Sequence, residues 1–248
     1  MTTCDVAGAS AVRPEYAMRA DRVDWPVCSR ALAEDGFVVL PAVLARTECA
    51  RVSGMYGDAC TFRSRVIMGR HGFGRGEYQY FADPLPEPVG ALRESFYRCV
   101  APIANEWEAQ LGSDRRFPTT LAAFRQQCRD AGQRRPTPLL LKYEPGDYNC
   151  LHQDLYGALD FPLQLAVLLS QPGDDFEGGE FVLTEQRPRM QSRVQVVPLA
   201  RGDGVLFATN FRPVRGARGI YRSRVRHGVS TVRSGRRYTL GIIFHDAE

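Results

Sequence analysis

The sequence predicts a mainly β protein with α-helices, in which a double-stranded β-helix (jelly-roll) core has N-terminal helices packed on it. After Thr137 the chain breaks into short apolar runs separated by Gly, Asp and Pro, which is typical of a sandwich or barrel. Before Thr137 it contains several stretches with apolar residues at helical spacing. We therefore place the β-helix core at about residues 138–246, as one unit with the preceding helices.

Length and composition indicate a single domain. The chain has 248 residues, 44% of them hydrophobic, and no repeat, low-complexity tract or linker divides it. We expect residues 1–22 to be a flexible N-terminus and residues 23–248 to form one domain. No apolar run approaches the ~18 residues of a membrane-spanning helix. The start lacks the features of a secretory signal, and the seven cysteines contain no CxxC pair, so we expect a cytoplasmic protein with reduced thiols and no membrane partner.

The half before Thr137 is expected to be largely helical. A helix at 25–35 should end at Gly36, because glycine readily adopts the left-handed conformation that terminates helices. Residues 62–82 are rich in glycine and aromatic side chains and indicate a loop or an edge hairpin. The other expected elements are a strand at 37–40 and helices at 44–58, 91–111 and 120–131.

The half after Thr137 should supply the strands of the core. Glycines in the segments 175–181 and 201–204 permit tight turns, so we interpret these segments as structural. The expected strands are the runs 138–143, 163–170, 180–184, 193–198, 204–209, 225–232 and 237–244.

Three polar residues form a candidate metal-binding set. Side chains alternate along an extended segment, so His152 and Asp154 point to the same side. His227 comes 75 residues after His152, and a barrel can bring such distant strands together on its inner face. Two imidazoles and one carboxylate occupy one face of an iron(II) ion and leave the other face open. The other two histidines, His71 and His245, stay without an assigned role, and we expect His245 to pack or to lie at the surface.

A second candidate site follows ten residues after His227. Arg237 and Thr239 share one face of a strand because they are two residues apart. A guanidinium on the inner face of a barrel can bind a carboxylate through two parallel hydrogen bonds, and the Thr239 hydroxyl could add a third. The neighbouring Arg236 should point outward. This arrangement indicates an anionic ligand for Arg237, because a buried arginine needs a partner.

The C-terminal motifs, in this order and spacing, resemble the iron(II)/2-oxoglutarate-dependent dioxygenases, in the branch shared by prolyl-hydroxylase-like and AlkB-like enzymes. The likeness covers about residues 138–246 and rests on LLLKYEPGDYNCLHQD, FEGGEFVLTE, PLARGDGVLF and RHGVSTVRSGRRYTLGIIFHD. The resemblance implies that His152, Asp154 and His227 are the catalytic iron ligands. Halogenating relatives carry a small residue in place of the carboxylate, so Asp154 implies a hydroxylase.

The resemblance also implies the co-substrates. The expected set is Fe(II), 2-oxoglutarate and O₂, with ascorbate as a reductant, and the expected reaction couples oxidative decarboxylation of 2-oxoglutarate to hydroxylation of a C–H bond. Arg237 would bind the distal carboxylate of 2-oxoglutarate, and Thr239 holds the second position of the family's Arg-x-Ser/Thr pattern. Tyr143 matches a tyrosine that contacts 2-oxoglutarate in several relatives; a purely structural role as a barrel-core aromatic stays open.

Two features bear on the primary substrate. The glycine- and aromatic-rich segment 62–82 could form a lid or a platform that stacks a flipped base. The stretch 210–237 contains nine arginines and no Asp or Glu, and could bind phosphates. These features favour oxidative demethylation of alkylated nucleic acid, and with it a role in DNA repair. Hydroxylation of a protein residue or a small metabolite is the alternative; a non-catalytic basic nucleic-acid-binding or metal-sensing module is the alternative of another class.

Overall fold

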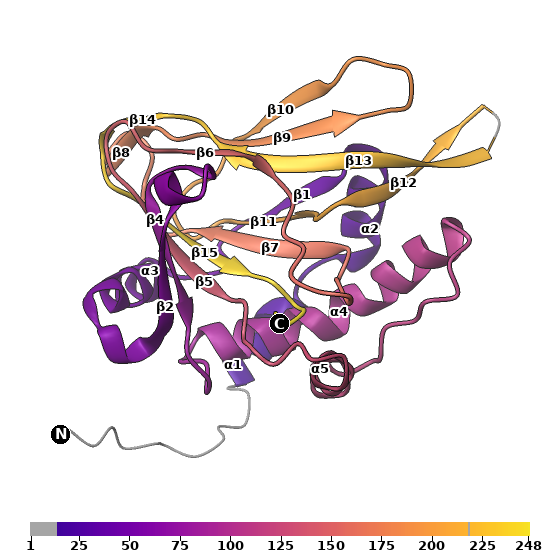
Figure 1. Ribbon diagram of the computed structural model, residues 1–248, viewed down its shortest axis with the longest axis horizontal. Coiled ribbons are helices and arrows are strands. Elements are labelled where there is room, and N and C mark those ends of the chain that lie inside the picture. Colours follow the sequence, from indigo (N-terminus) through magenta and orange to yellow (C-terminus); the bar gives the residue numbers. More distant parts are fainter. Residues whose placement is uncertain (1–13, 218) are drawn as a thin grey trace.

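The structure, a computed structural model, describes residues 14–217 and 219–248 and is built on two antiparallel β-sheets (Figure 1). Its strands are β1 (Phe37–Leu40), β2 (Phe62–Ile67), β3 (Gly74–Arg75), β4 (Glu77–Phe81), β5 (Leu139–Tyr143), β6 (Tyr148–His152), β7 (Leu163–Leu168), β8 (Phe176–Gly178), β9 (Phe181–Gln186), β10 (Arg193–Val197), β11 (Gly204–Ala208), β12 (Phe211–Gly216), β13 (Gly219–Val229), β14 (Val232–Gly235) and β15 (Arg237–Ile242). The first sheet has the order β1-β11-β7-β15-β5-β4-β2. The second has the order β10-β9-β13-β6-β3, with β12 paired to β13. Strands β14 and β8 form a separate two-stranded sheet. The expected fold class, a double-stranded β-helix with helices packed on it, is confirmed.

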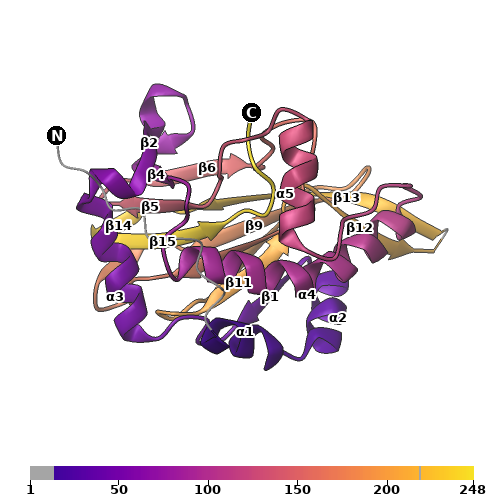
Figure 2. The ribbon, with the colours of Figure 1, turned by 90° about the horizontal axis from the view of Figure 1, so that it is seen from below.

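Helices pack along the first sheet (Figure 2). They are α1 (Pro14–Asp21), α2 (Trp25–Asp35), α3 (Arg46–Gly54), α4 (Val89–Gln110) and α5 (Leu121–Asp130). One of them, α2, also contacts β12 of the second sheet. Strand β7 is buried at all six positions, because one face packs toward the helices and the other faces the second sheet. Within the described ranges, no helix has both the length and the apolar character of a membrane span.

Part of the segment 1–22, which the sequence predicts to be flexible, forms a helix. Residues 14–21 form α1, which packs on α4, and the side chain of Tyr16 is buried. The Tyr16 hydroxyl donates a hydrogen bond to the Glu48 carboxylate at 2.9 Å. A helix of eight residues with a single large apolar anchor has too little periodicity to be recognised in the sequence. The expectation for residues 1–13 falls outside the described residues.

The other helices lie close to their expected positions. Helix α2 ends as expected at Gly36, whose φ of 81° is left-handed, and β1 has the expected bounds. Helix α3 is shorter than the expected 44–58, because a 3-10 turn follows it at Met55–Gly57. The segment 62–82 is a hairpin, as one of the two readings of the sequence predicted: β2 is the edge strand of the first sheet and β4 pairs with β5.

Four strands of the C-terminal half escaped the sequence analysis, namely β6, β8, β12 and β14. Strand β6 has mostly exposed or half-buried positions and a bulge opposite β13, so its sequence lacks regular apolar alternation. Strand β12 carries Pro213, and proline is uncommon in strands. Its partner β13 begins at Gly219, six residues before the expected strand at 225–232, because the first half of β13 forms a hairpin with the unpredicted β12.

Buried polar contacts attach the C-terminal segment to the helices. The guanidinium of Arg93 on α4 donates hydrogen bonds to the Ile243 and Phe244 carbonyls at 2.9 Å, and forms a fully buried ion pair with Asp246 at 2.7 Å. Between these contacts His245 is buried, and its Nδ1 accepts a hydrogen bond from the Phe161 amide at 3.1 Å. His245 therefore has a packing role, as expected from the sequence.

Replacement of His245 by asparagine should reduce the acid sensitivity of the fold. Burial lowers the pKa of His245 to about 4, whereas an unfolded histidine titrates near 6.5. Between these values the unfolded chain binds a proton that the native state does not. The free energy of unfolding should therefore fall as the pH drops from 6.5 to 4, by on the order of 3 kcal/mol in total from this residue. Urea unfolding of wild type and His245→Asn at several pH values measures the difference; equal pH slopes in the two proteins would contradict it.

Candidate metal and co-substrate site

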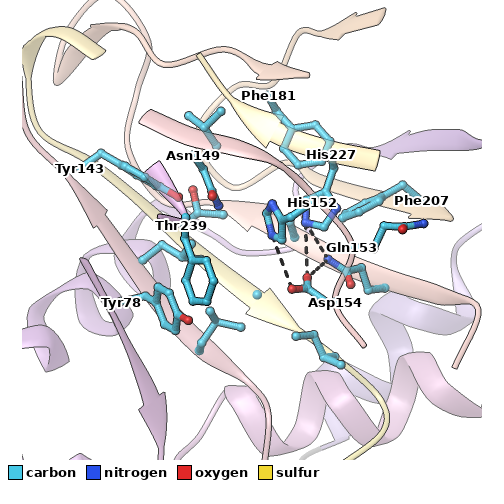
Figure 3. A pocket seen from close by; sticks show the side chains of 18 of the residues that line it. Tyr78, Tyr143, Asn149, His152, Gln153, Asp154, Phe181, Phe207, His227 and Thr239 are labelled. Atoms are coloured by element: carbon cyan, nitrogen blue, oxygen red, sulfur yellow. Dashed lines mark hydrogen bonds and ion pairs between the residues drawn. The ribbon is translucent and has the colours of Figure 1, made fainter. Parts of the chain in front are cut away.

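Two neighbouring strands of the second sheet bring the predicted metal residues together (Figure 3). His152 at the end of β6 pairs directly with His227 on β13, and their ring centroids are 4.2 Å apart. The carboxylate oxygens of Asp154 lie 3.5 Å from Nε2 of His152 and 3.3 Å from Nε2 of His227. One potential ligand atom of each residue lies within 4.8 Å of the other two. The structure thus places all three residues in one cluster.

A bulge makes this cluster possible. Asn149 pairs with Val229 and His152 pairs with His227, so three residues of β6 advance where β13 advances by two. With regular alternation Asn149 and His152 would point to opposite faces of the sheet. The extra residue turns both side chains into the cavity between the two sheets.

The donor set fits one metal ion. Two ligand atoms bound to an ion at about 2.1 Å and at right angles lie about 3 Å apart, close to the spacings found here. Nδ1 of His152 lies 2.8 Å from the Cys150 carbonyl, which can only accept a hydrogen bond, so Nδ1 carries the proton and Nε2 offers its lone pair. Two imidazoles and a carboxylate at one side could hold an ion and leave its remaining positions open.

The electrostatics keep Asp154 and His227 in the protonation states that bind metal. Burial opposes the charge of Asp154, but His152 and His227 outweigh it and hold the pKa of that carboxyl well below its usual range. Burial lowers the pKa of His227, and the neighbouring His152 lowers it further. Burial also opposes protonation of His152, but Asp154 outweighs this effect and raises the pKa of that imidazole. Asp154 is therefore an anion and His227 a neutral donor.

Two residues that the sequence analysis missed hold the carboxylate of Asp154. The Gln164 amide on β7 donates a hydrogen bond to Oδ2 at 2.8 Å, and the Tyr156 hydroxyl donates one to Oδ1 at 2.7 Å. The same Gln164 nitrogen lies 3.3 Å from Nε2 of His227. The sequence shows that Gln164 lies in a predicted strand and that Tyr156 follows Asp154 by two residues. Neither observation predicts which side chain contacts the carboxylate of Asp154.

The expected anion-binding residues lie in the same cavity. Arg237 and Thr239 point inward from β15, and Nη1 of Arg237 donates a hydrogen bond to the Thr239 hydroxyl at 2.5 Å. Arg237 is 1% exposed, and no carboxylate of the described residues pairs with it. Burial lowers the pKa of Arg237 to about 10. Tyr143, opposite Arg237 on β5, is fully buried beside Asn149, and its ring lies 5.7 Å from the guanidinium carbon.

The cavity has a volume of about 400 Å³. Its lining includes both the candidate metal ligands and the anion-binding pair Arg237 and Thr239. Its walls come from both sheets and are mainly apolar or aromatic, including Tyr78, Phe181 and Phe207 (Figure 3). Phe73 and Leu155 line it as well and are 48% and 44% exposed, which identifies the side that opens to solvent.

Arg236, the residue before Arg237, is exposed and pairs with Glu144 at 3.3 Å, so its expected outward direction is confirmed.

Comparisons with known structures agree with this architecture. An oxidoreductase of the 2OG-Fe(II) oxygenase family from Burkholderia pseudomallei aligns with a TM-score of 0.50 and 20% identity, over 91% of this chain and 94% of the other. A prolyl hydroxylase from Trichoplax adhaerens, solved with a hypoxia inducible factor peptide fragment, aligns with a TM-score of 0.53 and 14% identity, over 94% and 91%. At these identities the likeness establishes the fold.

Comparisons of sequence establish the family. Two uncharacterized proteins of Mycobacterium tuberculosis, MT2286 and Rv2227, are 48% identical over 229 residues, which cover 92% of this chain and 93% of theirs. Residues 76–247, well over half of the chain, match the Oxygenase-NA family, described as oxygenases catalysing oxidative methylation of damaged DNA. The cavity with its clustered metal-ligand residues lies almost entirely within that range. The protein therefore belongs to the Oxygenase-NA family of oxygenases.

Proposed function

We propose that this oxygenase is an iron(II)/2-oxoglutarate-dependent dioxygenase that acts in the cytoplasm. It would oxidise an alkyl group on damaged DNA and use the residues described above as its catalytic site. One observation carries the site assignment: a cluster of His152, Asp154 and His227 shares one cavity with a buried arginine that has no anionic partner among the described residues. The DNA substrate is supported by the family match and its description.

His152, Asp154 and His227 would hold Fe(II). When bound, the metal supplies the activation of O₂ that couples decarboxylation of 2-oxoglutarate to oxidation of a C–H bond. The chain orients the ligands, since the Cys150 carbonyl fixes the ring of His152, and Gln164 and Tyr156 fix the carboxylate of Asp154. Apolar walls exclude water from the reacting groups.

Arg237 would bind the distal carboxylate of 2-oxoglutarate. A buried guanidinium without a carboxylate partner is unfavourable, and a dicarboxylate in the cavity would remove this penalty with two parallel hydrogen bonds. Thr239 already accepts a hydrogen bond from Nη1 of Arg237, so its first role would be to orient the guanidinium. Tyr143, whose ring lies 5.7 Å from the Arg237 guanidinium carbon, and its neighbour Asn149 would present further polar groups to the same ligand.

Oxidation of a methyl group on a base nitrogen would replace one C–H bond by C–OH. The resulting hydroxymethyl group leaves as formaldehyde when its C–N bond breaks, and the nitrogen recovers a proton. The open side of the cavity carries the aromatic Phe73, and Tyr78 lines its wall; both rings are suited to contact a base.

Arg237→Ala should raise the KM for 2-oxoglutarate about 10- to 100-fold, because a charge-assisted hydrogen-bonded pair contributes about 1.5–3 kcal/mol. His152→Ala should abolish succinate formation with Fe(II), ascorbate and 2-oxoglutarate. The control is Arg236→Ala, which removes the adjacent but exposed arginine and should leave the KM unchanged. Equal effects of Arg236→Ala and Arg237→Ala would contradict the assignment.

Gln164→Leu and Tyr156→Phe should each weaken binding of Fe(II) about 10- to 100-fold, since each frees one oxygen of the Asp154 carboxylate. Anaerobic titration of the purified apoprotein with Fe(II) or Co(II) measures the affinity. Gln79→Leu is the matched control, because Gln79 is equally buried but donates to the Tyr56 carbonyl outside the site. Unchanged metal affinity in both site variants would show that the two side chains do not position Asp154.

A single-stranded oligodeoxynucleotide with one N-methylated base should lose its methyl group, with succinate and formaldehyde formed in equal amounts. Mass spectrometry of the oligonucleotide and assays of both products measure this, with His227→Ala as the inactive control. The DNA proposal is wrong if a panel of methylated bases remains intact and leaves succinate formation at its substrate-free rate.

A further inference from the structure

A two-stranded ribbon projects from the second sheet beside the active site (Figure 1). Strands β12 and β13 pair antiparallel from Phe211↔Arg224 to Gly216↔Gly219, and the ribbon extends past the strands that flank it. Its described residues include four exposed arginines, namely Arg215, Arg222, Arg224 and Arg226. The ribbon contains no acidic residue.

Three of these arginines form a row on one face of β13. Arg222, Arg224 and Arg226 are exposed, whereas the alternating Ser223, Val225 and His227 are buried. Residues two apart in a strand are spaced about 7 Å, so the row is about 14 Å long. This spacing is comparable to that of successive phosphates along a nucleic acid strand.

The arginines of the row have no acidic partners among the described residues. Among the described residues, no carboxylate lies within ion-pair distance of Arg215 or of the three arginines in the row. The buried Arg212 of the same ribbon does have a partner, Glu185 at 2.8 Å. Four neighbouring cations without counter-charges raise the local potential, which favours an anionic partner.

The row lies on the face of β13 opposite to His227, on a strand that adjoins the cavity wall. Gln153 lines the cavity and donates a hydrogen bond to the Val225 carbonyl at 3.0 Å, so the ribbon begins at the cavity wall. The segment after Gln153 then borders a depression in which Asp160 lies with Phe211 and Arg222. Asp160 is already paired with Arg115 at 2.7 Å, while Glu108 also lines this depression. The guanidinium of Arg224 covers the ring of Phe211, with 5.2 Å from its central carbon to the ring centroid.

We propose that the arginine row of β13, with Arg215, binds the phosphate backbone of the DNA strand whose damaged base lies in the cavity. The inference rests on the proposed function and adds to it the surface that holds the substrate outside the pocket. Guanidinium groups bind phosphates through paired hydrogen bonds, and the exposed Phe73 and Leu155 at the opening would contact bases. An acidic protein segment would use the charges but not this apolar opening.

The test compares two triple variants of the full-length protein. Arg222→Ser/Arg224→Ser/Arg226→Ser removes the row, and Arg46→Ser/Arg233→Ser/Arg236→Ser removes equal charge from exposed positions near α3 and β14, at the other end of the molecule. A fluorescein-labelled single-stranded oligodeoxynucleotide with one N-methylated base is titrated at several salt concentrations and followed by fluorescence anisotropy. Substrate-free succinate formation should equal that of wild type in both variants, because neither set touches the cavity residues that hold metal or co-substrate.

Loss of the row should weaken DNA binding at least about tenfold and reduce the slope of log K against log salt by about 2, since each phosphate contact on a single strand contributes about 0.7. The KM for the oligonucleotide should rise with kcat unchanged. The control variant should alter neither the slope nor the KM. Equal behaviour of the two variants, or no binding of DNA by wild type, overturns the inference.

The same experiment separates the inference from the proposed function. If wild type demethylates the oligonucleotide and both variants behave alike, the function stands and the role of the row is wrong. If wild type binds the oligonucleotide through the row but does not oxidise it, the binding surface is supported and the DNA-oxidising function is wrong. Equal row-dependent affinity for poly-glutamate would overturn the assignment to nucleic acid.

Discussion

The pairing of β6 with β13 is the constraint on which the site depends. It places His152 opposite His227, and the bulge in β6 turns Asn149 and His152 toward the same cavity. Asp154 lies two residues past the end of β6, and its carboxylate oxygens lie within 3.5 Å of both imidazoles. A shift of one residue in this register would point His152 out of the cavity, because side chains alternate between the two faces of a sheet. His152 would then lie apart from Asp154 and His227.

Some arginines of this protein have carboxylate partners, and others have none among the described residues. Arg93 and Arg212 are buried with carboxylate partners and hold elements together, whereas Arg237 is buried without one and faces the cavity. The exposed arginines of β13 also have no acidic partner in the described chain, but they lie in solvent, where an unpaired charge is tolerated. An unpaired buried cation and an unpaired exposed row therefore indicate two anions of different size, one enclosed and one extended.

The sequence was most informative where chemistry requires an unusual residue. Histidines are few in this chain, so His152 and His227 could be recognised with Asp154, and the spacing of Arg237 and Thr239 predicted their common face. Gln164 and Tyr156 could not be recognised, because their roles depend on which carboxylate the fold brings to them. Strand β6 was missed for a related reason: its bulge and its exposed positions remove the alternation by which strands are predicted.

The most direct test of the central claim is a crystal structure of the protein grown anaerobically with Mn(II) and 2-oxoglutarate, with anomalous data for the metal. The account predicts one anomalous peak bound by Nε2 of both histidines and by the Asp154 carboxylate, with the distal carboxylate of 2-oxoglutarate on the Arg237 guanidinium. A metal bound elsewhere, or a 2-oxoglutarate molecule that leaves Arg237 without a partner, would contradict it.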